Sequence, residues 1–144
     1  MMGDDAQTRL TLEGWLGGTP AYMSPEVVAG RGADSRSDVY ALSAVLYFAI
    51  SGSHPFEGAS VSSMLVAHLQ QEPEPPSARL GKPLPRLLEA FILRNLAKQP
   101  DERCANANDF ARELALTLDD DATKSDHFVE CEGGQRAPSS LRQP

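Results

Sequence analysis

Residues 18 to 26 read Gly18-Thr19-Pro20-Ala21-Tyr22-Met23-Ser24-Pro25-Glu26, and nearly every position in this run constrains the backbone. Gly18 permits dihedral angles that are closed to other residues. Pro20 and Pro25 fix their own φ and push the residues before them toward extended geometry. The run is therefore predicted to be a shaped loop followed by a short helical turn, and not a strand.

This run resembles the end of the activation segment of bacterial, eukaryotic-like (Hanks-type) Ser/Thr protein kinases, where the pattern is Gly-Thr-x-x-Tyr-x-[Ala/Ser]-Pro-Glu. Three more matches follow in the order of the family, and four ordered matches argue against coincidence. They are Asp38-Val39-Tyr40-Ala41-Leu42, Gly52-Ser53-His54-Pro55-Phe56 and Lys98-Gln99-Pro100-Asp101-Glu102-Arg103. The resemblance covers residues 11 to 118 and implies only the C-terminal part of a kinase domain.

The central helix is predicted over residues 37–51, where apolar side chains lie nearly all round the helical wheel. That pattern is typical of a helix buried inside its domain. Ser37 is the predicted N-cap, and Gly52 is predicted to end the helix. Ser43 stands where the family usually has glycine, which indicates crowding at a close helix contact.

Helical spacing predicts three more packed segments. They are a short helix from Val61 to His68, a helix with one apolar face from Leu84 to Leu96, and a last helix capped by Asn106 and Asp109 with Phe110, Leu114 and Leu118 on its inner face. We expect a mainly α fold of about five helices, the helical C-lobe of the protein-kinase-like fold without its N-lobe and catalytic loop. Residues 1–17 are expected to be a flexible remnant of the activation loop, residues 18–118 the partial kinase domain, and residues 119–144 an acidic disordered tail or linker.

The resemblance implies a role for each residue that it matches. Gly18, Thr19, Pro20 and Tyr22 would form the loop that positions the substrate, with the Thr19 hydroxyl bonded to the catalytic loop. The alternative for Thr19 is a hydroxyl that bonds to its own turn. Thr8 and Thr11 are candidate phosphorylation sites of the activation loop, or else solvated loop residues.

Two charged pairings also follow from the resemblance. Glu26 is implied to form a buried ion pair with Arg103, whose planar guanidinium binds a carboxylate bidentately. Asp38 is implied to accept hydrogen bonds from the catalytic-loop backbone, and without that loop it would lack partners. His54 is predicted to be a surface-loop imidazole, and His68 is predicted to be exposed and not a metal ligand.

The sequence lacks the groups that perform phosphoryl transfer. It contains no G-x-G-x-x-G, no V-A-I-K, no H-R-D-x-x-x-x-N and no D-F-G. ATP and Mg²⁺ belong to the intact family, and this chain alone is expected to bind neither, to hold no metal and to be inactive. A non-catalytic docking or pseudokinase-like module, and one half of a split kinase, remain alternatives to a partial kinase domain.

The composition excludes two classes of partner. A net charge of −7 argues against binding nucleic acid or an anionic membrane, both of which need basic surface. Cys104 and Cys131 have no paired spacing, which indicates reduced thiols in a cytoplasmic protein. No apolar run is long enough to cross a bilayer. The expected partners are a protein substrate or the missing N-terminal half of the kinase.

Overall fold

The computed structural model describes the backbone of residues 19–129 and the side chains of residues 19–119. This part of the chain is helical and contains no strand, which confirms the mainly α fold. Its elements are the 3-10 turn η1 (Pro20–Tyr22), α2 (Pro25–Val28), α3 (Ser35–Ser51), α4 (Val61–Gln70), α5 (Pro76–Leu80), α6 (Arg86–Asn95), the 3-10 turn η2 (Pro100–Glu102) and α7 (Ala107–Val129).

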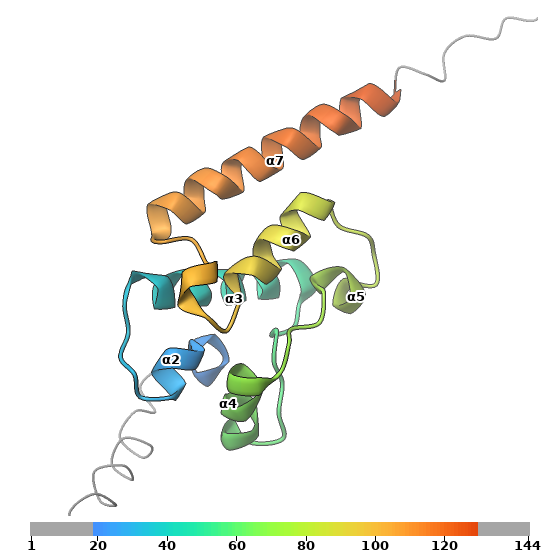
Figure 1. Cartoon of the computed structure of the whole chain (residues 1–144). Helices are drawn as coiled ribbons and strands as arrows, with labels where there is room; N and C mark the ends of the chain where they lie inside the picture. The colour runs from blue at the N-terminus through green and yellow to red at the C-terminus, as the bar shows by residue number, and fades with distance from the viewer. Residues whose placement is uncertain (1–18, 130–144) are drawn as a thin grey trace, which may run out of the picture.

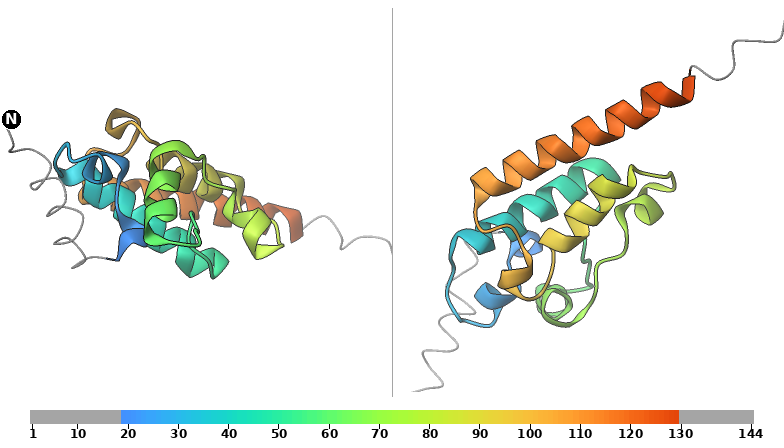
Figure 2. Two further views of the ribbon diagram at one scale, coloured as in Figure 1. Left: turned by 90° about the horizontal axis from the view of Figure 1, so that it is seen from below. Right: turned by 45° about the horizontal axis from the view of Figure 1, so that its top comes forward.

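Helix α3 lies at the centre, and every other part of the core is arranged around it (Figure 1). It contacts α5, α6, α7 and both 3-10 turns. Helices α3, α6 and α7 lie side by side, while η1, α2 and α4 form a second group across α3 from α7 (Figures 1 and 2). The segment that ends in Glu26 therefore lies on the opposite side of α3 from the last helix.

The ends of α3 are set by a capping box and a glycine. Asp34 is the N-cap: the Arg36 N–H donates to Asp34 Oδ1 at 2.8 Å, and the Asp34 N–H donates to Ser37 Oγ at 3.2 Å. The predicted N-cap at Ser37 is therefore wrong, because the aspartate three residues earlier satisfies the first free N–H groups. Gly52 ends the helix in the left-handed region with φ of 76°, which confirms the predicted stop.

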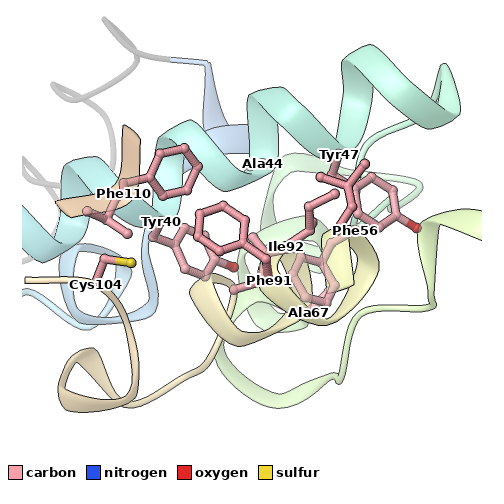
Figure 3. Packing of buried hydrophobic residues seen from close by; sticks show 12 residues of the cluster. Tyr40, Ala44, Tyr47, Phe56, Ala67, Phe91, Ile92, Cys104 and Phe110 are labelled. Carbon is pink, nitrogen blue, oxygen red and sulfur yellow. The ribbon is translucent and has the colours of Figure 1, made fainter. Parts of the chain in front are cut away.

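One face of α3 forms the core of the protein (Figure 3). Val39, Tyr40, Ala44 and Tyr47 on this face are fully buried. They pack with aromatic and aliphatic side chains from the following elements: Phe56, Ala67, Leu88, Phe91, Ile92, Leu96, Cys104 and Phe110. The rings of Phe91 and Phe110 lie 4.8 Å apart and join α6 to α7.

The opposite face of α3 is open, contrary to the prediction of burial on all sides. Leu42, Val45 and Phe48 are 39%, 48% and 41% exposed. Their spacing of three residues puts them on one stripe of the helix. The apolar residues of α3 lie on nearly all sides of the helix, as the sequence shows. The side chains of residues 19–119, however, cover only one face of this helix.

The last helix begins as predicted and ends later. Asp109 N–H donates to Asn106 Oδ1 at 3.0 Å, which confirms the cap at Asn106. Phe110 is buried and Leu114 packs against the core, whereas Leu118 is 49% exposed, so its predicted place on the inner face is wrong. Backbone hydrogen bonding carries α7 on through Val129, so the tail expected from residue 119 is helical in its first part.

Candidate functional site

The loop that the sequence indicates as substrate-positioning runs into η1. Thr19 is exposed and stands at the N-cap of η1, where its carbonyl accepts the Tyr22 N–H at 3.1 Å and its side chain makes no capping bond. Pro20 begins the turn, and Ala21 is buried beneath it. The Thr19 hydroxyl is therefore presented to solvent. Gly18, Thr8 and Thr11 lie outside the described residues.

Glu26 and Arg103 meet in a buried bidentate ion pair. Arg103 Nη1 donates to Glu26 Oε1 at 2.8 Å, and Arg103 Nη2 donates to Glu26 Oε2 at 2.9 Å. The Arg103 side chain is fully buried and that of Glu26 is 9% exposed. Ser37 Oγ donates to Glu26 Oε1 at 2.6 Å, so the carboxylate also joins α2 to α3. The pair ties the Ser-Pro-Glu element to the turn before α7.

The remaining donors of Arg103 are also satisfied. They reach the backbone carbonyls of Ala97, Arg36 and Lys98 at 2.9, 3.0 and 3.2 Å. The guanidinium lies 4.9 Å from the centre of the Tyr40 ring, on the buried face of α3. One side chain thus joins four segments of the chain.

The pair controls the protonation of Glu26. Burial opposes ionisation of the carboxyl, but hydrogen bonds from Arg103 and Ser37 and the positive charge of Arg103 outweigh it. Together they lower the pKa of Glu26 to about 2. Glu26 is therefore ionised at every pH at which the protein is expected to be folded.

Asp38, in the first turn of α3, has quite different surroundings from this ion pair. It is exposed, and its carboxylate has no hydrogen-bond or ion-pair partner among the side chains that the structure describes. The resemblance implies that a catalytic-loop backbone would bond to it.

A row of aromatic rings links η1 to the open face of α3. The His54 ring lies 5.3 Å from that of Tyr22, edge to face, and stacks on Phe48 at 4.7 Å. His54 is half-buried, and its Nδ1 has no hydrogen-bond partner. His54 thus lies on the loop after α3, as predicted, with its ring half-buried between those of Tyr22 and Phe48.

His68 is fully buried, so its predicted exposure is also wrong. Its Nδ1 lies 2.7 Å from the hydroxyl of Tyr40, and its ring packs edge-on against Phe56. Burial, with the positive charge of Lys98 and the neighbouring His54, lowers the pKa of His68 to about 4. The sequence held one indication of this burial: His68 lies four residues after Met64 and so falls on the apolar face of α4.

Lys98 closes the same cluster from the segment after α6. Its ammonium lies 4.1 Å from the centre of the Phe56 ring and has no hydrogen-bond partner. Burial lowers the pKa of Lys98 to about 8, assisted by Arg103 and opposed by Glu72. Sequence reasoning treated Lys98 only as part of a motif and missed this position.

The geometry agrees with the comparison to known families. The model of the protein kinase domain matches residues 10–114, which is well over half of the 144 residues. The chain belongs to the protein kinase family.

Its curated relatives are bacterial Ser/Thr kinases of much greater length. Serine/threonine-protein kinase Pkn1 of Myxococcus xanthus is 40% identical over 114 residues, 79% of this chain and 16% of Pkn1. Pkn3 of the same organism is 44% identical over 108 residues, 73% of this chain and 19% of Pkn3. PknB of Mycobacterium tuberculosis is 42% identical over 97 residues, 67% of this chain and 15% of PknB. The chain is a partial kinase domain and spans less than a fifth of each relative.

Ser/Thr kinases in general use ATP with Mg²⁺ and act on proteins. No group of three or more His, Cys, Asp and Glu side chains gathers in this part of the chain, and Asp38 stands alone. No described helix is both long and apolar enough to span a membrane.

Proposed function

We propose that this chain is the substrate-side part of a Ser/Thr protein kinase, inactive by itself and competent when the ATP-binding half of the domain is supplied. The bidentate pair between Glu26 and Arg103 carries the proposal, because it ties the Ser-Pro-Glu element, which follows the Thr19 turn, to the helical body. Kinase catalysis is positioning together with charge neutralisation. This chain contributes positioning only.

The positions of the described side chains indicate which part of a kinase domain this chain supplies and which part it would need. The exposed hydroxyl of Thr19 and the ring of Tyr22 stand at the edge of the body, next to the open face of α3. Asp38 begins that same face with a carboxylate that has no partner among described residues. A catalytic loop packed on this face would cover the apolar stripe and give Asp38 its hydrogen bonds.

The test is complementation in a phosphate-transfer assay. The full 144-residue chain is purified alone, and also co-expressed with the N-terminal part of the kinase domain of Pkn1, up to its counterpart of residue 10. Labelled phosphate from ATP is followed onto a Ser/Thr-containing protein. We expect no transfer by either part alone and measurable transfer by the complex. Transfer by the chain alone, or a stable complex without activity, would refute the proposal.

A non-catalytic binding module is the second candidate, and exposed apolar residues on α4 favour it. Val61 and Val66 are 48% and 47% exposed on α4. Under this alternative the chain is a stable monomer that melts in one cooperative transition. A partial domain with an open face is instead expected to self-associate or to bind a hydrophobic dye. Sedimentation and calorimetry of the purified chain distinguish the two.

A further inference from the structure

The imidazole ring of His54 connects η1 to helix α3. Its centre lies 5.3 Å from that of Tyr22, with the two rings edge to face, and 4.7 Å from that of Phe48, with the two rings nearly parallel at 22°. Tyr22 belongs to η1 and Phe48 belongs to α3. The three rings therefore form a row with His54 in the middle.

The loop that carries His54 is held on both sides of this residue. Before it, the Ser53 N–H donates to Ser51 Oγ at 3.3 Å in the turn that follows α3. After it, Pro55 and Phe56 are buried in the core. Proline also favours extended geometry in the residue before it. The ring of His54 is therefore presented to Tyr22 by a well-packed support.

The contact with His54 is the main constraint on the outer side of Tyr22. Within residues 19–119, His54 provides the one ring that contacts Tyr22, and no described side chain bonds to the Tyr22 hydroxyl. The inner side of Tyr22 packs against the apolar core. Edge-to-face pairs favour one relative orientation of the two rings. The direction of the Tyr22 ring thus depends on His54.

We propose that His54 is a positioning residue for the substrate loop: its ring, backed by Phe48, holds Tyr22, and with it η1, in the arrangement that receives a protein substrate. This inference rests on the proposed function, because it concerns the loop that begins at Thr19. The Nδ1 atom of His54 has no hydrogen-bond partner. The ring contact therefore performs this role, and we expect phenylalanine to replace His54 and alanine to fail.

The ring contact is tested by NMR of the full 144-residue chain with labelled tyrosine rings. The chain has three tyrosines, and Tyr22→Phe identifies the signals of Tyr22. His54→Ala is expected to move these signals toward their positions in the unfolded chain, because the imidazole no longer shields them. His54→Phe is expected to keep them displaced. His68→Gln is the matched control: His68 contacts Tyr40, so this change is expected to move the signals of Tyr40 and not those of Tyr22.

Positioning is tested in the active complex with the N-terminal part of Pkn1. His54→Ala is expected to raise the KM for the protein substrate about threefold to tenfold, the change in an equilibrium that loss of one aromatic pair produces. The kcat and the KM for ATP are expected to change little, because a contact that only holds the loop contributes to binding. His54→Phe is expected to restore the KM, and His68→Gln is expected to leave it unchanged.

Four outcomes would overturn the proposal: Tyr22 signals that stay in place in His54→Ala, Tyr22 signals that move as far in His68→Gln, a fall in kcat without a rise in KM, and failure of His54→Phe to restore the KM. Where His54→Ala does not fold, His54→Leu serves, since it fills the space without a ring. The NMR readout needs no activity. A complex that transfers no phosphate refutes the kinase proposal, whereas an active complex with an unchanged KM in His54→Ala refutes the role of His54.

Discussion

Replacing Arg103 by methionine is expected to remove the main tie between the Ser-Pro-Glu element and the rest of the domain. The side chain is fully buried and donates to both Glu26 oxygens and to three backbone carbonyls. In R103M the carboxylate of Glu26 stays buried with Ser37 as its one remaining side-chain partner. Breaking a buried pair in this way costs about 3–5 kcal/mol.

Such a loss is a large part of the total stability of a domain this size, about 5–15 kcal/mol. Urea unfolding followed by circular dichroism measures it, and with an m-value of about 1–3 kcal/mol/M the midpoint is expected to fall by roughly 2 M. Where R103M does not fold, Arg103→Lys serves instead, since an ammonium keeps the charge but cannot form the bidentate contact.

Two further variants test the reasoning behind the number. The double variant E26Q/R103M removes both charges of the pair, and it is expected to recover at least half of the loss. D101N breaks the exposed pair between Asp101 and Arg36, and it is expected to leave the midpoint unchanged, because exposed pairs contribute little. The reasoning is refuted if R103M unfolds at the wild-type midpoint, or if the double variant is no more stable than R103M.

Two other predictions concern buried polar groups. The pKa of His68 is about 4 in the folded protein, against an ordinary value of 6.5. As the pH falls, the unfolded chain therefore binds a proton before the folded protein does. Folding stability is lost between pH 6.5 and pH 4, by roughly 3 kcal/mol. His68→Gln, which keeps an acceptor for Tyr40, is expected to flatten urea midpoints over that window, and an unchanged slope would contradict the assignment. The hydroxyl of Ser43 is fully buried without a hydrogen-bond partner, so Ser43→Ala is expected to raise stability by about 1 kcal/mol in thermal melts. Ser37→Ala is expected to lower it, because that hydroxyl donates to Glu26; equal effects of the two changes would show that the orphaned hydroxyl is not the cause.

Local chemistry was readable from the sequence where a residue acts on its own neighbours. Gly52 ends α3 because only a residue without a Cβ takes φ of 76° at no cost, and Asn106 caps α7 because its amide reaches the next free N–H groups. The N-cap of α3 was misplaced at Ser37 because two residues, Asp34 and Ser37, have the right chemistry, and only the backbone of Asp34 is extended there.

Tertiary structure alone decided which apolar and polar side chains are covered, since burial depends on what another element lays against each face. The periodicity of α3 is apolar on both sides, yet Val39 and Tyr47 are buried while Val45 and Phe48 face outward. His68 is a polar residue but is buried, because the Tyr40 hydroxyl and the Phe56 ring, from other segments of the chain, contact its imidazole. The family motifs predicted that Glu26 and Arg103 meet. They did not predict that Arg103 also donates to the backbone carbonyls of Ala97, Arg36 and Lys98, because only folding brings these carbonyls together around the guanidinium.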